Sequence, residues 1–128
     1  MSICIFCDLI KPEQIIARSE HFFVVYDINP IQQGHLLIIS NEHFMNITEL
    51  SPEILLDFVL LEQRLTAAIE NNFDVKGVTI FQNNGRTMDK GTHFHAHVVP
   101  RYEQDGFWKN LHIEQKPMDL EKLSSLVG

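Results

Sequence analysis

The sequence has few cysteines, few basic residues and no long apolar run. Only two of its 128 residues are cysteine, and a chain of this length can bury a core without disulfide bonds. No apolar run approaches the ~20 residues that a membrane helix needs. A secretory signal begins with a basic stretch followed by an apolar one, and the first residues do not show this pattern. We therefore expect a cytoplasmic protein with no membrane partner.

Basic side chains are outnumbered by acidic ones. Ten Lys and Arg stand against 17 Asp and Glu, which gives a formal net charge of −7. Because nonspecific nucleic-acid binding needs a basic face, we expect no nucleic-acid partner. A phosphate ligand would have to be held locally, by backbone amides, histidines and a few cations. The chain length predicts a single domain over residues 1–128.

Short segments rich in β-branched and aromatic residues predict a sheet. They are separated by turn signals such as Pro30, Gly34 and Asn83-Asn84-Gly85. Residues 35–40 are almost continuously apolar, which indicates burial on both faces. The expected strands cover residues 14–19, 22–27, 35–40, 78–82 and 94–101.

One long helix is expected in the middle of the chain. Ser51 is a suitable N-cap before Pro52, and the helical pattern continues to residue 71 or 72. The fold class is therefore α+β, an antiparallel sheet of about five strands with one long helix packed on it. The tail, residues 102–128, is less regular and predicts a short helix over 119–126. The buried stripe of the long helix is predicted to contain Leu55, Phe58, Val59, Glu62, Leu65 and Ile69.

Three histidines alternate along the last predicted strand: His93, His95 and His97. Residues two apart in a strand point to the same face, so the three imidazoles lie side by side, about 7 Å from one to the next. Such a row is hard to explain by packing, because neighbouring groups that can carry a positive charge repel each other. Imidazoles on one face suit either a metal site or nucleophilic attack on phosphorus. The spacing alone does not choose between the two.

The two cysteines, Cys4 and Cys7, form a Cys-x-x-Cys pair. In a reducing compartment this spacing indicates a metal site or a redox pair more than a structural disulfide.

The stretch His93-Phe94-His95-Ala96-His97-Val98-Val99 resembles the signature of the histidine triad family of nucleotide-binding proteins. Further stretches resemble landmarks of that family in the same order, and together they cover residues 3–101. One loop, residues 85–92, departs from the family pattern because it has no Gln before the triad. The landmarks are Cys4-Ile5-Phe6-Cys7, Tyr26-Asp27-Ile28-Asn29-Pro30, Gly34-His35, Asn41-Glu42-His43, Asn83-Asn84-Gly85 and Pro100-Arg101.

The resemblance implies catalytic roles for three histidines. His95 matches the nucleophile that attacks the α-phosphorus, while His97 and His35 match residues that orient the site and contact the phosphate. The implied reaction cleaves a phosphoanhydride or phosphoramidate bond through a nucleotidyl-His95 intermediate, with no metal required for catalysis. A dinucleoside polyphosphate or a nucleoside phosphoramidate is the implied substrate, with a purine base favoured.

The resemblance also implies residues that bind the substrate. Asp27 matches an acid that accepts hydrogen bonds from the ribose, and the alternative for an Asp here is to cap the turn before Pro30. Phe6, Val25 and Ile28 would line the base pocket, and the alternative for Phe6 and Val25 is the core. The phosphate contacts are assigned to Asn83, to Lys90 and to the backbone around Thr92.

A second set of residues matches the zinc ligands of some bacterial members of the family: Cys4, Cys7, His43 and His93. Two thiolates and two imidazoles are a usual tetrahedral set for structural zinc. A site with four protein ligands has no open position, so the zinc would be structural, and His95 would stay free to react. A redox pair and idle thiols remain the alternatives.

The resemblance further implies a homodimer whose interface contains the long helix and the central strand. Two functions of other classes remain open. One is a nucleotide-binding sensor without turnover, and the other is a catalytic metal centre built on the triad.

Overall fold

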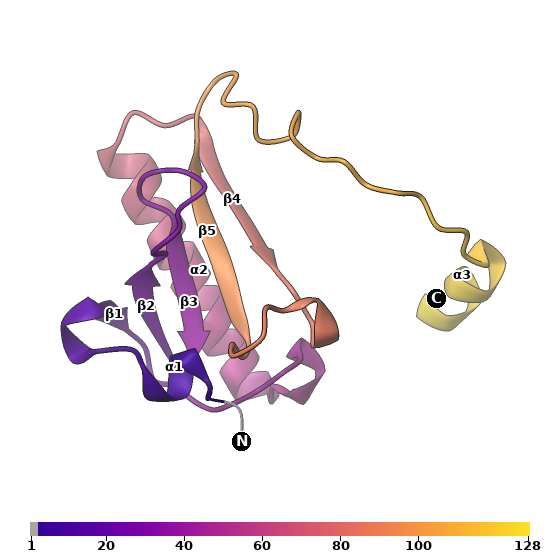
Figure 1. Cartoon of the computed structure of the whole chain (residues 1–128), viewed down its shortest axis with the longest axis horizontal. Coiled ribbons are helices and arrows are strands. Elements are labelled where there is room, and N and C mark those ends of the chain that lie inside the picture. The colour runs from indigo at the N-terminus through magenta and orange to yellow at the C-terminus, as the bar shows by residue number, and fades with distance from the viewer. Residues whose placement is uncertain (1–2) are drawn as a thin grey trace.

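The computed structural model describes residues 3–128, and its centre is a five-stranded antiparallel sheet with a long helix across one face (Figure 1). The sheet order is β1-β2-β3-β5-β4. The predicted α+β fold class and the antiparallel pairing are therefore confirmed. The strands are β1 (Ile15–Arg18), β2 (Phe22–Tyr26), β3 (Leu36–Ser40), β4 (Gly77–Gln82) and β5 (His95–Arg101).

The long helix, α2 (Pro52–Asn72), begins where the sequence predicts. The hydroxyl of Ser51 accepts a hydrogen bond from the backbone N–H of Ile54, which satisfies one of the free donors at the helix N-terminus. The predicted stripe was wrong at Val59, which is 55% exposed, and it missed Leu61. The buried stripe is centred on the line from Phe58 to Ile69, and Val59 is turned about 100° around the helix from Phe58. The side chains that α2 buries are Phe58, Leu61, Leu65 and Ile69.

Strand β3 is buried on both faces, as its apolar run predicts. Leu36 and Ile38 pack in the cluster that includes the α2 side chains. Leu37 and Ile39 point to the opposite face and pack in a second, smaller cluster with Val25. The sheet therefore has an apolar layer on each side, and the second layer supports the residues described below.

Several short helices were not predicted, since three or four residues are too few to show a helical period. The one that matters for function is α1 (Ile5–Asp8), near the N-terminus. Phe6 from α1 and Ile10 just after it pack against the second apolar cluster. The short 3₁₀ turns are η1 (Pro12–Gln14), η2 (Ile47–Glu49) and η3 (Gly85–Thr87).

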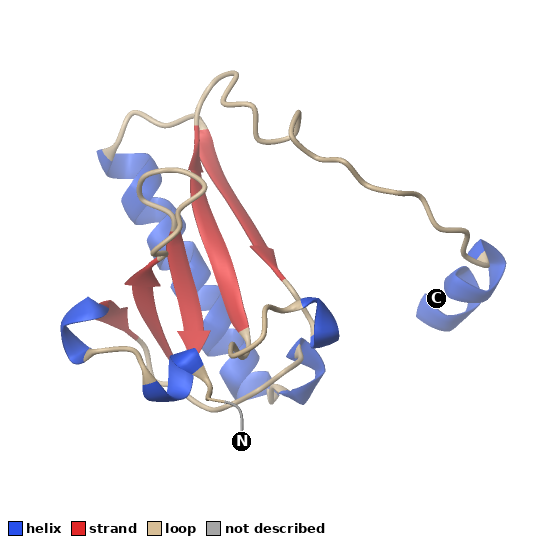
Figure 2. Cartoon of the chain, in the orientation of Figure 1, coloured by secondary structure: helices blue, strands red, loops and turns tan. Residues whose placement is uncertain are grey.

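After β5 the chain leaves the sheet and runs out to a last helix, α3 (Leu120–Val127), as Figure 2 shows. The guanidinium of Arg101 holds the start of this tail, because it pairs with both carboxylate oxygens of Asp105 at 2.7 and 2.9 Å. The prediction of a short helix over 119–126 agrees with α3 within one residue. Within residues 3–128, no helix is long and apolar enough to cross a membrane.

Candidate active site and metal centre

His95 and His97 lie on the face of the sheet opposite α2. In the β3–β5 register, Ile39 pairs with His95 and Leu37 with His97. Both imidazoles line a cavity of about 460 Å³. This nucleotide-sized cavity also contains most of the residues predicted to bind substrate, namely Phe6, Val25, Asp27, Ile28 and Thr92.

The hydrogen bonds of His95 define which of its nitrogens is free to react. Its Nδ1 lies 2.7 Å from the backbone carbonyl of His93. Since a carbonyl oxygen only accepts, Nδ1 carries the proton and Nε2 carries the lone pair. Burial lowers the pKa of His95, which keeps this neutral form at neutral pH.

A chain of hydrogen bonds fixes the tautomers of His35 and His97 in the same way. The backbone N–H of Ile31 donates to Nδ1 of His35 at 3.0 Å, so the proton of His35 is on Nε2. That Nε2–H donates to Nδ1 of His97 at 2.9 Å, which leaves Nε2–H of His97 as a donor. Burial lowers the pKa of both residues, and that of His97 falls to about 4. The outcome is a neutral His95 with a free lone pair on Nε2, beside a neutral hydrogen-bond donor.

Asp27 caps a turn and also lines the cavity. Its Oδ1 accepts a hydrogen bond from the backbone N–H of Asn29 at 2.8 Å, so it does cap the turn. Its Oδ2 lies 3.4 Å from Nε2 of His35 and 4.0 Å from Nδ1 of His97. The carboxylate lines the cavity and favours the protonated form of both imidazoles, but burial outweighs it.

Two aromatic rings hold the imidazoles in place. The rings of Phe6 and His95 form a T-shaped pair at a centroid distance of 4.9 Å. Phe81 stacks on His97 at 4.4 Å with its ring tilted by only 10°. Sequence reasoning missed Phe81, because the contact depends on the pairing of Phe81 with His97 between β4 and β5. Val25 is 2% exposed and Phe6 is half-buried, so both belong to the apolar layer as well as to the cavity wall.

The loop before the triad differs from the expectation. Neither Lys90 nor Asn83 is among the residues that line the cavity, whereas Asp89 is. Both the backbone N–H and the hydroxyl of Thr92 donate to the carbonyl of Asp89, which closes a tight turn and leaves the Lys90 side chain exposed. The loop therefore brings a negative charge to the cavity where a positive one was predicted.

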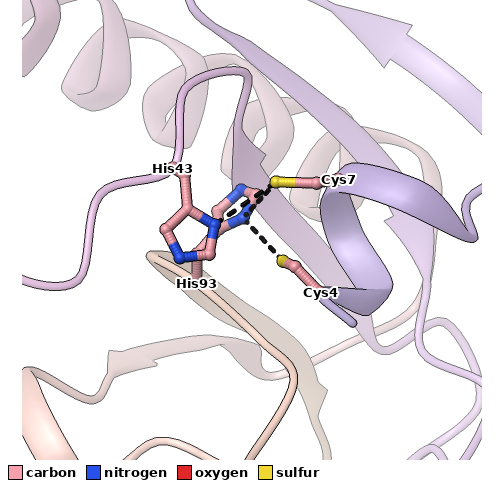
Figure 3. A group of neighbouring side chains, drawn as sticks. All are labelled: Cys4, Cys7, His43 and His93. Carbon is pink, nitrogen blue, oxygen red and sulfur yellow. Dashed lines mark hydrogen bonds between the residues drawn. The ribbon is translucent and has the colours of Figure 1, made fainter. Parts of the chain in front are cut away.

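The second predicted cluster assembles, and it includes the first histidine of the triad, His93 (Figure 3). The four ligand atoms of Cys4, Cys7, His43 and His93 all lie within 4.8 Å of one another. Nδ1 of His93 lies 3.2 Å from the sulfur of Cys4, and Nδ1 of His43 lies 3.3 Å from that of Cys7. Two thiols and two imidazoles are a donor set that suits zinc.

The far side of the His93 ring also fits a metal ligand. Its Nε2 donates to the backbone carbonyl of Ser40 at 2.7 Å, so the lone pair is on Nδ1, toward the sulfurs. Desolvation and the neighbouring Cys4 raise the pKa of the Cys7 thiol to about 11. This is the opposite of the lowered pKa of a reactive redox cysteine. A divalent cation would reverse the shift by stabilising both thiolates.

Comparisons with known proteins identify relatives of this chain. The model of the HIT domain family matches residues 9–104. "Protein hit" of Bacillus subtilis is 32% identical in an alignment of 133 positions, gaps included, that covers 98% of this chain and 92% of the relative. Adenosine 5'-monophosphoramidase hnt1 of Schizosaccharomyces pombe is 34% identical over 107 residues, covering 80% of this chain and 77% of the relative.

Solved structures have the same fold. A HIT family protein from Bacillus subtilis superposes with a TM-score of 0.75 at 30% identity, over 97% of this chain and 94% of the other. A Zn-bound histidine triad family protein from Mycobacterium smegmatis superposes with a TM-score of 0.69 at 29% identity, over 97% and 89% of the two chains.

Proposed function

The chain belongs to the histidine triad (HIT) family, and from this premise we propose that it hydrolyses or transfers a nucleotidyl group at the α-phosphate of a nucleotide. Its relatives include an adenosine 5'-monophosphoramidase and a bis(5'-adenosyl)-triphosphatase, so the family contains nucleotide hydrolases. The observation that carries the proposal is the bond from Nδ1 of His95 to the carbonyl of His93. It leaves Nε2 with the lone pair that a nucleophile needs.

The proposed reaction has two steps. The lone pair on Nε2 of His95 attacks the α-phosphorus, a nitrogen–phosphorus bond forms, and the bond to the leaving amine or phosphate breaks. The leaving group departs with one proton, for which Nε2–H of His97 is the donor. Water then attacks the nucleotidyl-His95 intermediate, its oxygen bonds to phosphorus and the nitrogen–phosphorus bond breaks. One proton of the water replaces the one given to the leaving group, so the nucleoside monophosphate leaves with both histidines restored.

The cavity lining supports a choice between the two substrate classes. Phe6, Val25 and Ile28 provide apolar surface for a base, purine in our proposal, and Asp27 provides an acceptor for ribose hydroxyls. Asp27 and Asp89 both face the cavity, and the whole chain carries a net charge of −7. A dinucleoside polyphosphate carries more negative charge than a nucleoside phosphoramidate, so these carboxylates disfavour it. We therefore propose an adenosine phosphoramidate as the preferred substrate class.

We also propose that Cys4, Cys7, His43 and His93 hold a structural zinc ion. The close approach of their ligand atoms and the Zn-bound relative support this assignment. When bound, the ion would cross-link three separate segments of the chain and supply no chemistry to the reaction. Replacing Cys4 by Ser should remove zinc, measured by elemental analysis, and should lower the melting temperature. Unchanged metal content in this variant would contradict the assignment.

A homodimer is part of the proposal. The outward side of α2 exposes Leu56, Val59 and Leu60, and β4 is the edge strand beside it. An apolar helix face next to a free strand edge is suited to a two-fold interface. Light scattering after size-exclusion chromatography should give the mass of two chains, and Val59→Glu should give one chain.

Kinetics would test the proposed function. Wild type and His95→Ala should be compared on adenosine 5'-phosphoramidate and diadenosine tetraphosphate, each with and without a chelator. We expect turnover by the wild type, faster with the phosphoramidate, and its loss in His95→Ala. Rapid loss of activity in chelator with the fold intact would indicate a catalytic metal centre. Tight nucleotide binding without turnover would indicate a sensor.

A further inference from the structure

We infer that metal binding at Cys4, Cys7, His43 and His93 controls nucleotide affinity, because it docks one wall of the nucleotide-sized cavity. This inference rests on the proposed function and concerns the segment of residues 4–10, here called the N-terminal wall. In it Cys4 and Cys7 are positioning residues, since neither lines the cavity.

The metal ligands and the cavity wall are interleaved in the same few residues. Cys4 is the N-cap of α1 and Cys7 lies within it, so both thiols belong to this short helix. Four of the side chains between and after them line the cavity. These are Ile5, Phe6, Leu9 and Ile10.

The N-terminal wall has little to hold it in place by itself. Helix α1 has four residues and buries none of them, and a helix of one turn is not stable in isolation. Leu9 is 56% exposed, and Phe6 and Ile10 are only partly buried. A backbone bond from Ile5 N–H to the carbonyl of Gly91 at 2.6 Å joins it to the triad loop.

The cluster provides the missing attachment. It joins α1 to His43, which follows β3, and to His93, which precedes β5 (Figure 3). Phe6 contacts both sites, since its ring forms T-shaped pairs with His93 at a centroid distance of 5.5 Å and with His95 at 4.9 Å. A metal ion on the four ligands would therefore fix Phe6 against both the metal ligand and the proposed nucleophile.

Removal of the metal should act on binding more than on chemistry. His95 keeps its place on β5 and its bond to the His93 carbonyl, whereas the N-terminal wall loses its attachment. We expect the affinity for AMP to fall about tenfold, the loss of roughly one aromatic contact. KM for the phosphoramidate should rise by a similar factor, with kcat changed by less than about twofold.

Hydrogen exchange and calorimetry would test this on the full chain. Zinc-loaded and chelated wild type should be compared for exchange of the amides of residues 5–10 and for the AMP dissociation constant. The inference predicts fast exchange and about tenfold weaker binding after chelation, both restored by added zinc. Equal protection of these amides with and without zinc would overturn it. So would an AMP dissociation constant that does not change.

Variants separate the wall from the metal. His43→Ala removes a ligand that lies outside the N-terminal wall and should behave like chelated wild type, whereas His112→Ala, an exposed histidine in the tail, should not. Phe6→Ala keeps all four ligands, so it should bind zinc fully yet bind AMP as weakly as the chelated protein. Chelating Phe6→Ala should then weaken AMP binding by less than about twofold, because its wall contact is already gone. If chelation weakened AMP binding by the same factor in Phe6→Ala as in the wild type, the inference would be overturned.

These readouts do not depend on turnover. A protein that passes them but hydrolyses no nucleotide would refute the proposed reaction and leave the inference standing. A protein that turns over the phosphoramidate, and whose N-terminal wall does not change with zinc, would support the proposed reaction and overturn the inference.

Discussion

The backbone carbonyl of His93 accepts a hydrogen bond from Nδ1 of His95 at 2.7 Å, while the ring of His93 turns toward the sulfurs of Cys4 and Cys7. One residue thus serves two neighbouring sites, through its main chain on one side and its side chain on the other. This arrangement explains how three alternating histidines avoid forming a single cluster. His93 joins the thiols, His95 keeps a free nitrogen, and His97 bonds to His35.

The hydrogen-bond chain through His35 can be tested by His35→Ala. His35 is buried, and the substitution leaves the N–H of Ile31 and Nδ1 of His97 without partners. We expect the free energy of unfolding to fall by about 1–3 kcal/mol. We also expect kcat to fall at least about tenfold, because His97 loses its fixed tautomer. Urea unfolding and steady-state kinetics measure the two effects, with His112→Ala as the control. A wild-type kcat in a folded His35→Ala protein would contradict the chain.

Stability should depend on pH through His97. Its pKa is lowered to about 4 in the fold, first by burial and then by the neighbouring His95 and His35, against about 6.5 in an unfolded chain. Between these two pH values the unfolded chain binds more protons than the folded one. The free energy of unfolding is therefore at its full value above pH 6.5 and falls as the pH drops toward 4. The loss attributable to His97 is at most about 3 kcal/mol.

Chemical denaturation at pH 7 and pH 4.5 measures that loss. His97→Asn has no group that titrates in this range, so its stability should fall less than that of the wild type over the same interval. An equal fall in both proteins would assign the effect to other groups.

The two neighbouring loop residues Asp89 and Lys90 provide a matched pair for substrate choice. Asp89 lines the cavity, and Lys90 does not. Asp89→Asn removes a negative charge near the phosphates, so we expect kcat/KM for diadenosine tetraphosphate to rise about threefold relative to the phosphoramidate. Lys90→Gln should leave this ratio unchanged. A larger effect of Lys90→Gln would contradict this assignment, because it would mean that the Lys90 side chain contacts the phosphates.

Much of this site could be predicted from the sequence, for reasons that concern local pattern. The alternation of His93, His95 and His97 places their side chains on one face of a strand at once. The turn before Pro30 and the capped helix at Ser51 are equally local signals. These features need no knowledge of which strands pair.

What the sequence did not reveal depends on contacts between distant segments. The stack of Phe81 on His97 follows from the β4–β5 register, which no local pattern specifies. Asp89 lines the cavity in place of Lys90 because the hydroxyl of Thr92 donates to the carbonyl of Asp89 and so shapes the loop. The helical spacing predicts Val59 in the buried stripe because it lies four residues after Leu55, yet it is exposed. Local pattern identifies the residue types, and the fold decides which of them meet.

The most direct test of the proposed nucleophile is to trap the intermediate. Wild type mixed with adenosine 5'-phosphoramidate and quenched within one turnover should gain the mass of one adenylyl group, and peptide mapping should place it on His95. His97→Asn should slow the formation of this adduct without moving it. A wild-type protein that turns over substrate with no adduct on His95, or a His95→Ala protein that turns over at the wild-type rate, would contradict the account.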